Sequence, residues 1–142
     1  MKVEIKELSE STESAIAHSR CCVQFLKTGS TRWVFLIGKF AFKIPSFFSW
    51  KNFLLGLLAN MQEVNFSKIL CMKEKLCPIK FHIPLGFLVV MPRVRVLQEN
   101  ELSKTELDLF CICNEHYKIP AELKADSFGY LKGKLVAIDY GS

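Results

Sequence analysis

The chain has 142 residues, of which 50% are hydrophobic and 12% aromatic, and its formal net charge is +5. This is the length of one domain, and the apolar content is ample for a core, which excludes an intrinsically disordered protein. The lysines and arginines are spread along the chain rather than gathered in a block. A nucleic-acid surface is therefore not indicated, and anionic small ligands fit the charge equally well.

The cysteines and the N-terminal segment bear on the compartment. The six cysteines form no C-x-x-C pair and have no histidines at the spacing of a zinc site, so we expect most of them to be small core residues. Residues 1–19 form a polar segment of mixed charge that lacks the apolar stretch of a secretory signal. We therefore expect reduced thiols, no disulfides and a cytoplasmic location.

Three strands are predicted in the first part of the chain. The runs CCVQFLK, RWVFLIG and FAFKIP are rich in β-branched and aromatic residues. The residues between them, TGST and then Gly38-Lys39, are typical of turns. The sequence therefore predicts an antiparallel meander that ends at Pro45.

The apolar stretch FFSWKNFLLGLLANM predicts a core helix. A membrane span is not predicted, because Lys51 and Asn52 interrupt the stretch and what remains is far shorter than the roughly 20 residues that a spanning helix needs. Ser46 or Ser49 would cap the helix, which continues to about Leu70. A partner groove or a membrane surface is the alternative for this stretch. The residues expected on the buried face are Phe53, Leu54, Leu57, Leu58, Met61, Val64 and Phe66.

Two more strands, a second helix and a hairpin are predicted downstream. The run CPIKFHIPLGFLVVMPRVRVL contains two apolar segments broken at Pro84 and Gly86. In SFGYLKGKLVAIDYG, a turn at Lys132-Gly133 joins two strands, and the second strand presents Asp139 at its end, where metal ligands often lie; an ordinary turn is the alternative. The segment SKTELDLFCICNEHY has helical periodicity, with Ser103 as its cap and with Leu107, Phe110, Cys111 and Tyr117 mostly on one face.

This order of elements resembles the protein-kinase-like fold. In that family the third strand carries a lysine that binds nucleotide phosphates and pairs with a glutamate of the next helix, and FAFKIP and NMQEVNF offer Lys43 and Glu63. Each of these residues taken singly is more often on the surface. The segment VVMPRV resembles the hinge that contacts adenine, which would place Val90 and Met91 against the base; an ordinary buried strand is the alternative.

The family's catalytic loop, H-R-D-L-x-x-x-N, is matched by PAELKADSF. The resemblance puts Glu122 in the place of the catalytic aspartate and Ser127 in that of the metal-binding asparagine, with Asp126 as the metal ligand if the register slips by one residue. The longer glutamate side chain moves the carboxylate, and a displacement of this kind can cost about 100-fold in rate. Serine is a weaker magnesium ligand than an amide oxygen. The motif IDYG resembles the family's D-F-G, so Asp139 would hold magnesium.

The glycine-rich loop of the family is reduced to KTGSTRWV. Gly29 alone remains to let the backbone approach a phosphate, and Ser30, Thr31 or Arg32 would compensate through their side chains. An ordinary hairpin turn explains this segment equally well.

The resemblance covers residues 20–142 and implies an α+β fold with ATP and Mg²⁺ as cofactors. Residues 20–92 would form an N-lobe of five antiparallel strands and one long helix, and residues 93–142 the hinge, a helix and the catalytic-loop hairpin, a truncated C-lobe that stops at D-Y-G. The chain resembles small bacterial and bacteriophage kinase-like proteins.

The departures from the motifs favour a pseudokinase that binds nucleotide and acts on a protein partner. The alternatives are a minimal phosphotransferase with Glu122 as base and, at the lowest weight, a small basic nucleic-acid-binding domain. We expect a partner or a second copy to bind at the C-terminal half. The apolar residues expected to lack cover there are Leu109, Ile112, Phe128 or Leu135.

Overall fold

A computed structural model describes residues 23–26 and 29–141, so the predicted polar segment 1–19 lies outside the described residues. Two short 3₁₀ turns, η1 and η2, accompany the helices and strands. The elements in chain order are β1 (Gln24–Leu26), β2 (Arg32–Ile37), β3 (Phe40–Pro45), α2 (Trp50–Phe66), α3 (Leu70–Lys73), β4 (Phe81–Ile83), η1 (Pro84–Gly86), β5 (Leu88–Pro92), β6 (Arg95–Val96), α4 (Lys104–Cys111), η2 (Ala125–Ser127), β7 (Phe128–Leu131) and β8 (Lys134–Ala137).

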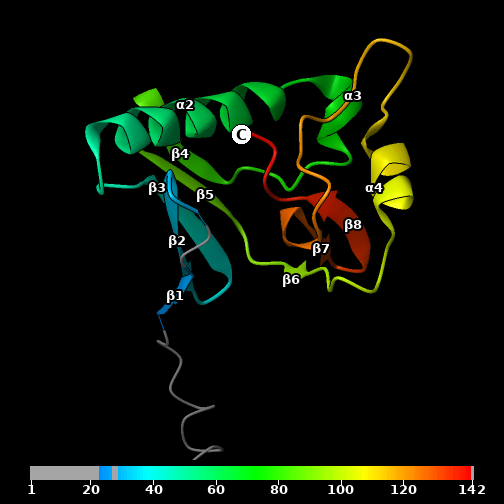
Figure 1. The fold of residues 1–142 in the computed structure, drawn as a ribbon, viewed down its shortest axis with the longest axis horizontal. Coiled ribbons are helices and arrows are strands. Elements are labelled where there is room, and N and C mark those ends of the chain that lie inside the picture. The colour runs from blue at the N-terminus through cyan, green and yellow to red at the C-terminus, as the bar shows by residue number, and fades with distance from the viewer. Residues whose placement is uncertain (1–22, 27–28, 142) are drawn as a thin grey trace, which may run out of the picture.

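The strands form two sheets. The larger has five strands in the order β1-β2-β3-β5-β4, and the smaller has the order β6-β7-β8, with antiparallel pairing throughout both. Figure 1 shows α2 lying along the larger sheet, α4 beside the smaller one, and the C-terminal end of the chain next to α2. The predicted α+β class, with a five-stranded antiparallel sheet and one long helix, is confirmed.

The register of the larger sheet assigns side chains to its two faces. Val34 pairs with Lys43, and Ala41 pairs with both Leu36 and Met91. Because side chains alternate along a strand, these residues share one face. The predicted meander therefore places Lys43 among apolar side chains on the inner face of the sheet.

Helix α2 begins where the sequence predicts but ends earlier. The Ser49 hydroxyl oxygen accepts a hydrogen bond from the Asn52 amide at 3.2 Å, which is the expected N-cap contact. The helix ends at Phe66 rather than near Leu70. There the Ser67 hydroxyl donates to the Val64 carbonyl at 2.7 Å, a local bond that competes with helix continuation.

The predicted buried face of α2 is mostly wrong. Leu54, Leu58 and Met61 are 40–50% exposed, and Val64 is the one member of the predicted set that is buried. The helix instead packs through small and polar residues because its backbone approaches its neighbours closely. A Cβ atom on Gly56 would lie 2.3 Å from the Thr31 carbonyl oxygen. The buried residues are Gly56, Ala59, Asn60, Glu63 and Val64.

Asn60 joins α2 to the sheet. Its amide nitrogen donates to the Gly86 carbonyl at 2.8 Å and to the Lys43 carbonyl at 3.3 Å. The side chain is fully buried, so these bonds offset the desolvation of the amide. This contact fixes α2 against β3 at the level of Lys43.

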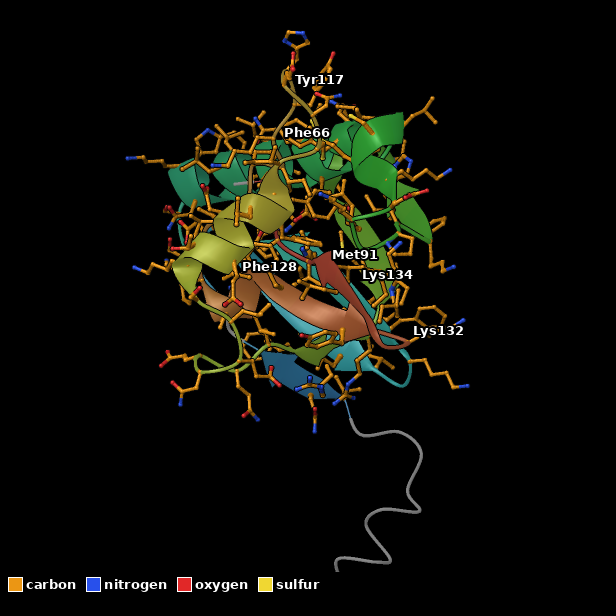
Figure 2. The ribbon with its side chains drawn as sticks, turned by 90° about the vertical axis from the view of Figure 1, so that its right-hand side faces the viewer. Phe66, Met91, Tyr117, Phe128, Lys132 and Lys134 are labelled. Carbon is orange, nitrogen blue, oxygen red and sulfur yellow. The ribbon has the colours of Figure 1, made fainter. Side chains whose placement is uncertain are left out.

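In the C-terminal half, α4 and the hairpin form as predicted, but Tyr117 is not on the helix. Ser103 and Glu106 make a capping box, and α4 ends at Cys111. The Asn114 side-chain oxygen then accepts from the amides of His116 and Tyr117, which turns the chain and leaves Tyr117 half exposed on an outer loop (Figure 2). Lys132 and Gly133 both have positive φ, at 51° and 80°, as a tight two-residue hairpin turn requires.

The core includes part of the C-terminal half, where we expect apolar side chains without cover. Phe128 is fully buried against Phe110, with ring centroids 6.0 Å apart, so the expectation that it lacks cover is wrong. Leu135 is half-buried, whereas Leu109 and Ile112 are exposed. Among the described cysteines, Cys77 and Cys111 are buried in the core and Cys71 is exposed.

No helix in the described part of the chain is both long and apolar enough to cross a bilayer.

Candidate functional site

A cavity of about 300 Å³ lies between the inner face of the larger sheet and the segment that leads from β5 to β6. Its walls come from both sheets and from the residues after β8. One part is apolar, and the other carries charged groups. The apolar lining includes Val34, Leu36, Ala41, Met91, Val94, Val96 and Ile138, and the charged residues are Arg32, Lys43, Asp126 and Asp139.

Lys43 and Glu63 form a buried ion pair at the charged end. The Lys43 Nζ lies 2.8 Å from the Glu63 Oε1, and the two side chains are 8% and 0% exposed. Lys43 also donates to the Ile138 carbonyl oxygen. A lysine on a sheet face and a glutamate on a helix bury their charges together because each offsets the desolvation of the other. The predicted ion pair is confirmed.

Arg32 also contacts the Glu63 carboxylate and reaches Asp139. One terminal nitrogen lies 2.7 Å from the Glu63 Oε1, and the other donates to the Asp139 Oδ1. Burial alone would lower the pKa of the Arg32 guanidinium, but the charges of Glu63 and Asp139 outweigh it and raise that pKa. The sequence suggested Arg32 only as a substitute for loop glycines. Its bridging position could have been found from strand alternation, which places it on the same face as Val34.

Asp139 lines the cavity two residues after the end of β8. Its side chain is 40% exposed. Burial alone would raise the pKa of this carboxyl, but the Arg32 guanidinium and then the Lys43 ammonium lower it below its ordinary value. The Asp139 carboxylate therefore interacts electrostatically with both Arg32 and Lys43.

Ser127 and Asp126 lie close to Asp139 in different ways. The Ser127 carbonyl accepts from the amides of Ile138 and Asp139 at 2.9 and 3.3 Å, and its side chain is buried. Asp126 is exposed and lines the cavity. The structure thus brings the backbone of Ser127 and the side chain of Asp126 to the predicted site.

Arg32 contacts two of the carboxylates that lie at or near the predicted magnesium site. Within the described ranges, no three His, Cys, Asp or Glu side chains are grouped so that they could hold a metal. The Asp139 carboxylate contacts the Arg32 guanidinium, and the Glu63 Oε1 is shared by Arg32 and Lys43, whereas the buried Glu63 Oε2 has no hydrogen-bond partner among the described residues. Proteins usually hold magnesium through one or two carboxylates together with substrate phosphates, and here Arg32 occupies one oxygen of Glu63 and one of Asp139.

Glu122 and Gly29 are not part of the cavity lining. The Glu122 carboxylate pairs with Lys124 at 2.5 Å, and these side chains are 57% and 65% exposed. Neither Glu122 nor Gly29 lines the cavity, and a Cβ atom on Gly29 would meet no atom within 4 Å. Their catalytic and phosphate-binding roles stay predictions.

Of the two residues predicted to contact adenine, one lines the cavity. Met91 is 2% exposed and lines it, whereas the adjacent Val90 faces the other side of β5. The Val90 carbonyl accepts from the Lys80 amide, and the Arg93 amide donates to the Lys39 carbonyl, both at 2.8 Å. Figure 2 shows Met91 within the body of the molecule and Lys132 at the outer edge.

No protein-family model matches the chain, and neither a curated protein nor a solved structure matches it. A functional proposal therefore depends on the chemistry of the cavity. An apolar part next to two cations can take a ligand that is apolar at one end and anionic at the other.

Proposed function

We propose that the chain is a kinase-like nucleotide-binding protein, a pseudokinase that acts through a protein partner. The observation that supports this most is the buried Lys43–Glu63 pair at the charged end of the cavity, with Asp139 beside it. A lysine held by a carboxylate on rigid elements is a preorganised cation for phosphate oxygens. The resemblance in the sequence places the same three residues in those roles.

The ligand that fits this cavity is an adenine nucleotide such as ATP. Aliphatic side chains from both sides, including Val34, Ala41 and Ile138, would enclose a flat base. Lys43 and Arg32 would meet the phosphates through charge-assisted hydrogen bonds. Base and phosphates together match the division of the cavity into an apolar and a charged part.

Phosphoryl transfer is proposed to be weak or absent. Proton transfer needs a base within hydrogen-bonding reach of the reacting hydroxyl. Glu122, the candidate base, instead pairs with Lys124 and lies outside the cavity lining. Arg32 also bonds carboxylate oxygens of Glu63 and Asp139 that magnesium, a second requirement of the reaction, would use.

Action through a partner would use exposed apolar side chains. In the C-terminal half, Leu109 is 63% and Ile112 is 44% exposed. A second exposed set lies on the outer face of α2, where Trp50, Leu54 and Leu58 are accessible. Such surfaces favour contact with another protein. A cytoplasmic location is part of this proposal.

Titration calorimetry with ATP tests nucleotide binding. The Ala41→Leu variant fills the apolar part without touching a charge, and Lys43→Met removes the cation. Because a charge-assisted hydrogen bond contributes about 1.5–3 kcal/mol, we expect Lys43→Met to weaken binding by about tenfold or more. Lys134→Ala, on the exposed hairpin, is the matched control and should leave the affinity unchanged.

Radiolabelled ATP tests the absence of transfer. We expect no magnesium-dependent labelling of the chain itself or of a generic protein acceptor. Labelling that is abolished by Glu122→Gln would make the phosphotransferase the better proposal. An absence of ATP binding by the wild type would contradict the nucleotide-binding function itself.

A further inference from the structure

We infer that Arg32 takes the place of a divalent metal in this cavity, so that the nucleotide binds through protein cations alone and Asp139 anchors Arg32 instead of coordinating an ion. The nucleotide part of this inference rests on the proposed function. The metal part stands on the geometry of Arg32, Glu63 and Asp139.

The Arg32 guanidinium is held between two carboxylates. It bonds Glu63 with one terminal nitrogen and Asp139 with the other, and the residue is 6% exposed. Such a bridge joins α2 to the segment after β8, two parts of the chain 76 positions apart (139 − 63). A divalent cation between the same carboxylates would have to displace the guanidinium.

The backbone beside Arg32 is fixed, so its side chain starts from a defined position. The Thr31 carbonyl accepts from the Ser46 amide at 2.8 Å, and Arg32 pairs with Pro45 in the sheet. Helix α2 closes over this point, since a Cβ atom on Gly56 would lie 2.3 Å from the same Thr31 oxygen. Rigid supports of this kind keep a binding group in place without cost at the moment of binding.

The four charges joined by these ion pairs are balanced. Lys43 and Arg32 contribute two positive charges, and Glu63 and Asp139 contribute two negative charges, while Asp126 adds one further negative charge to the lining. A divalent ion entering between Glu63 and Asp139 would be repelled by Arg32 and Lys43, and Arg32 already bonds one oxygen of each carboxylate. Phosphate oxygens are attracted by both cations and repelled by both carboxylates, so their binding depends on the donors that Arg32 and Lys43 still offer.

Donors remain for the phosphates after these contacts are made. A guanidinium has about five N–H groups and an ammonium about three. The bonds described use two on Arg32, to Glu63 and Asp139, and two on Lys43, to Glu63 and Ile138. Both side chains therefore retain donors that a phosphate can use without breaking the existing network.

The test of the metal part uses Mn²⁺ alone, followed by electron paramagnetic resonance of the free ion. We expect no saturable Mn²⁺ site in the wild type and in Arg32→Lys, which keeps the cation. Arg32→Ala and the longer Arg32→Gln should gain a saturable site that Asp139→Asn removes. A urea denaturation curve for each variant identifies those that fold.

Two results would overturn the metal part. One is a wild-type Mn²⁺ site that Asp139→Asn abolishes, because Arg32 would then not exclude the ion. The other is the failure of folded Arg32→Ala and Arg32→Gln to gain a site, because the carboxylates would then not be available to metal even without the guanidinium.

The nucleotide part is tested by titrating ATP in EDTA and in excess Mg²⁺. The wild type should bind with the same affinity, within about twofold, in both conditions, whereas Arg32→Gln should bind at least about tenfold more weakly in EDTA. ATP binding by the wild type only with Mg²⁺ would overturn the inference. Binding in neither condition would reject the proposed function, and the Mn²⁺ result would still decide the role of Arg32.

Discussion

Two lysine–glutamate pairs in this chain have the same chemistry and different surroundings. Lys43 and Glu63 are 8% and 0% exposed, and Lys43 lines the cavity. Lys124 and Glu122 are 65% and 57% exposed, and neither is part of the lining. The first pair is held by a sheet and a long helix, and the second lies within three residues of a loop. Burial, more than the distance between the charges, therefore determines how strongly breaking a pair affects the stability of the fold.

The largest expected effect comes from breaking the buried pair. Glu63→Gln leaves Lys43 and Arg32 buried without their shared carboxylate, so we expect a loss of about 3–5 kcal/mol in the free energy of unfolding. Urea denaturation measures this loss. Glu122→Gln is the matched control, and because its pair is exposed the change should stay below about 1 kcal/mol. Equal losses in the two variants would contradict the difference between the pairs.

A smaller effect is expected where α2 meets the C-terminal residues. A Cβ atom on Gly141 would lie 2.2 Å from the Ala59 carbonyl oxygen and 2.5 Å from the Glu63 Cγ. We expect Gly141→Ala to lower the free energy of unfolding by about 1–3 kcal/mol, because this site has no space for a methyl group. Gly29→Ala, where a Cβ atom meets nothing within 4 Å, is the control and should be nearly neutral. If Gly141→Ala is as stable as that control, the residues after Asp139 do not pack on α2 as described.

The smallest effect concerns pH. Arg32 and Lys43 lower the pKa of Asp139 below the value of about 3.9 that an aspartate has in an unfolded chain. The stability that this carboxylate contributes is therefore complete above about pH 4 and is lost as the pH falls through its lower folded pKa. The stability difference between the wild type and Asp139→Asn, measured by urea denaturation at successive pH values, should shrink in that acidic range. A difference that is constant from neutral to acidic pH would show that the two cations do not act on Asp139.

Much of the fold could be predicted from local patterns. Turn residues marked the meander and the hairpin at Lys132-Gly133, and Ser49 and Ser103 marked the starts of α2 and α4. The buried face of α2 could not be predicted from its apolar residues. Close backbone approach at Gly56 and the buried charge of Glu63 orient this helix, and both depend on contacts made far along the chain.

Part of the candidate site could be predicted from the sequence, and the rest depends on contacts between distant segments. Lys43, Glu63 and Asp139 were found through their order in the sequence, and the structure brings them together. The bridging role of Arg32 was missed because it depends on three-dimensional proximity to two carboxylates from distant segments. Glu122 matches a motif position, but its side chain forms an ion pair with Lys124 that faces the solvent. The two residues lie in a local turn, in which the Lys124 amide donates to the Glu122 carbonyl at 2.8 Å.

The central claim is that a nucleotide binds between the apolar side chains and the two buried cations. Chemical-shift mapping of the amide resonances during an ATP titration tests this most directly. The account predicts saturable shifts at Val34, Ala41, Met91 and Asp139, with the exposed hairpin residue Lys134 unaffected. Saturable shifts that avoid these four residues, or no shifts at millimolar ATP, would contradict it.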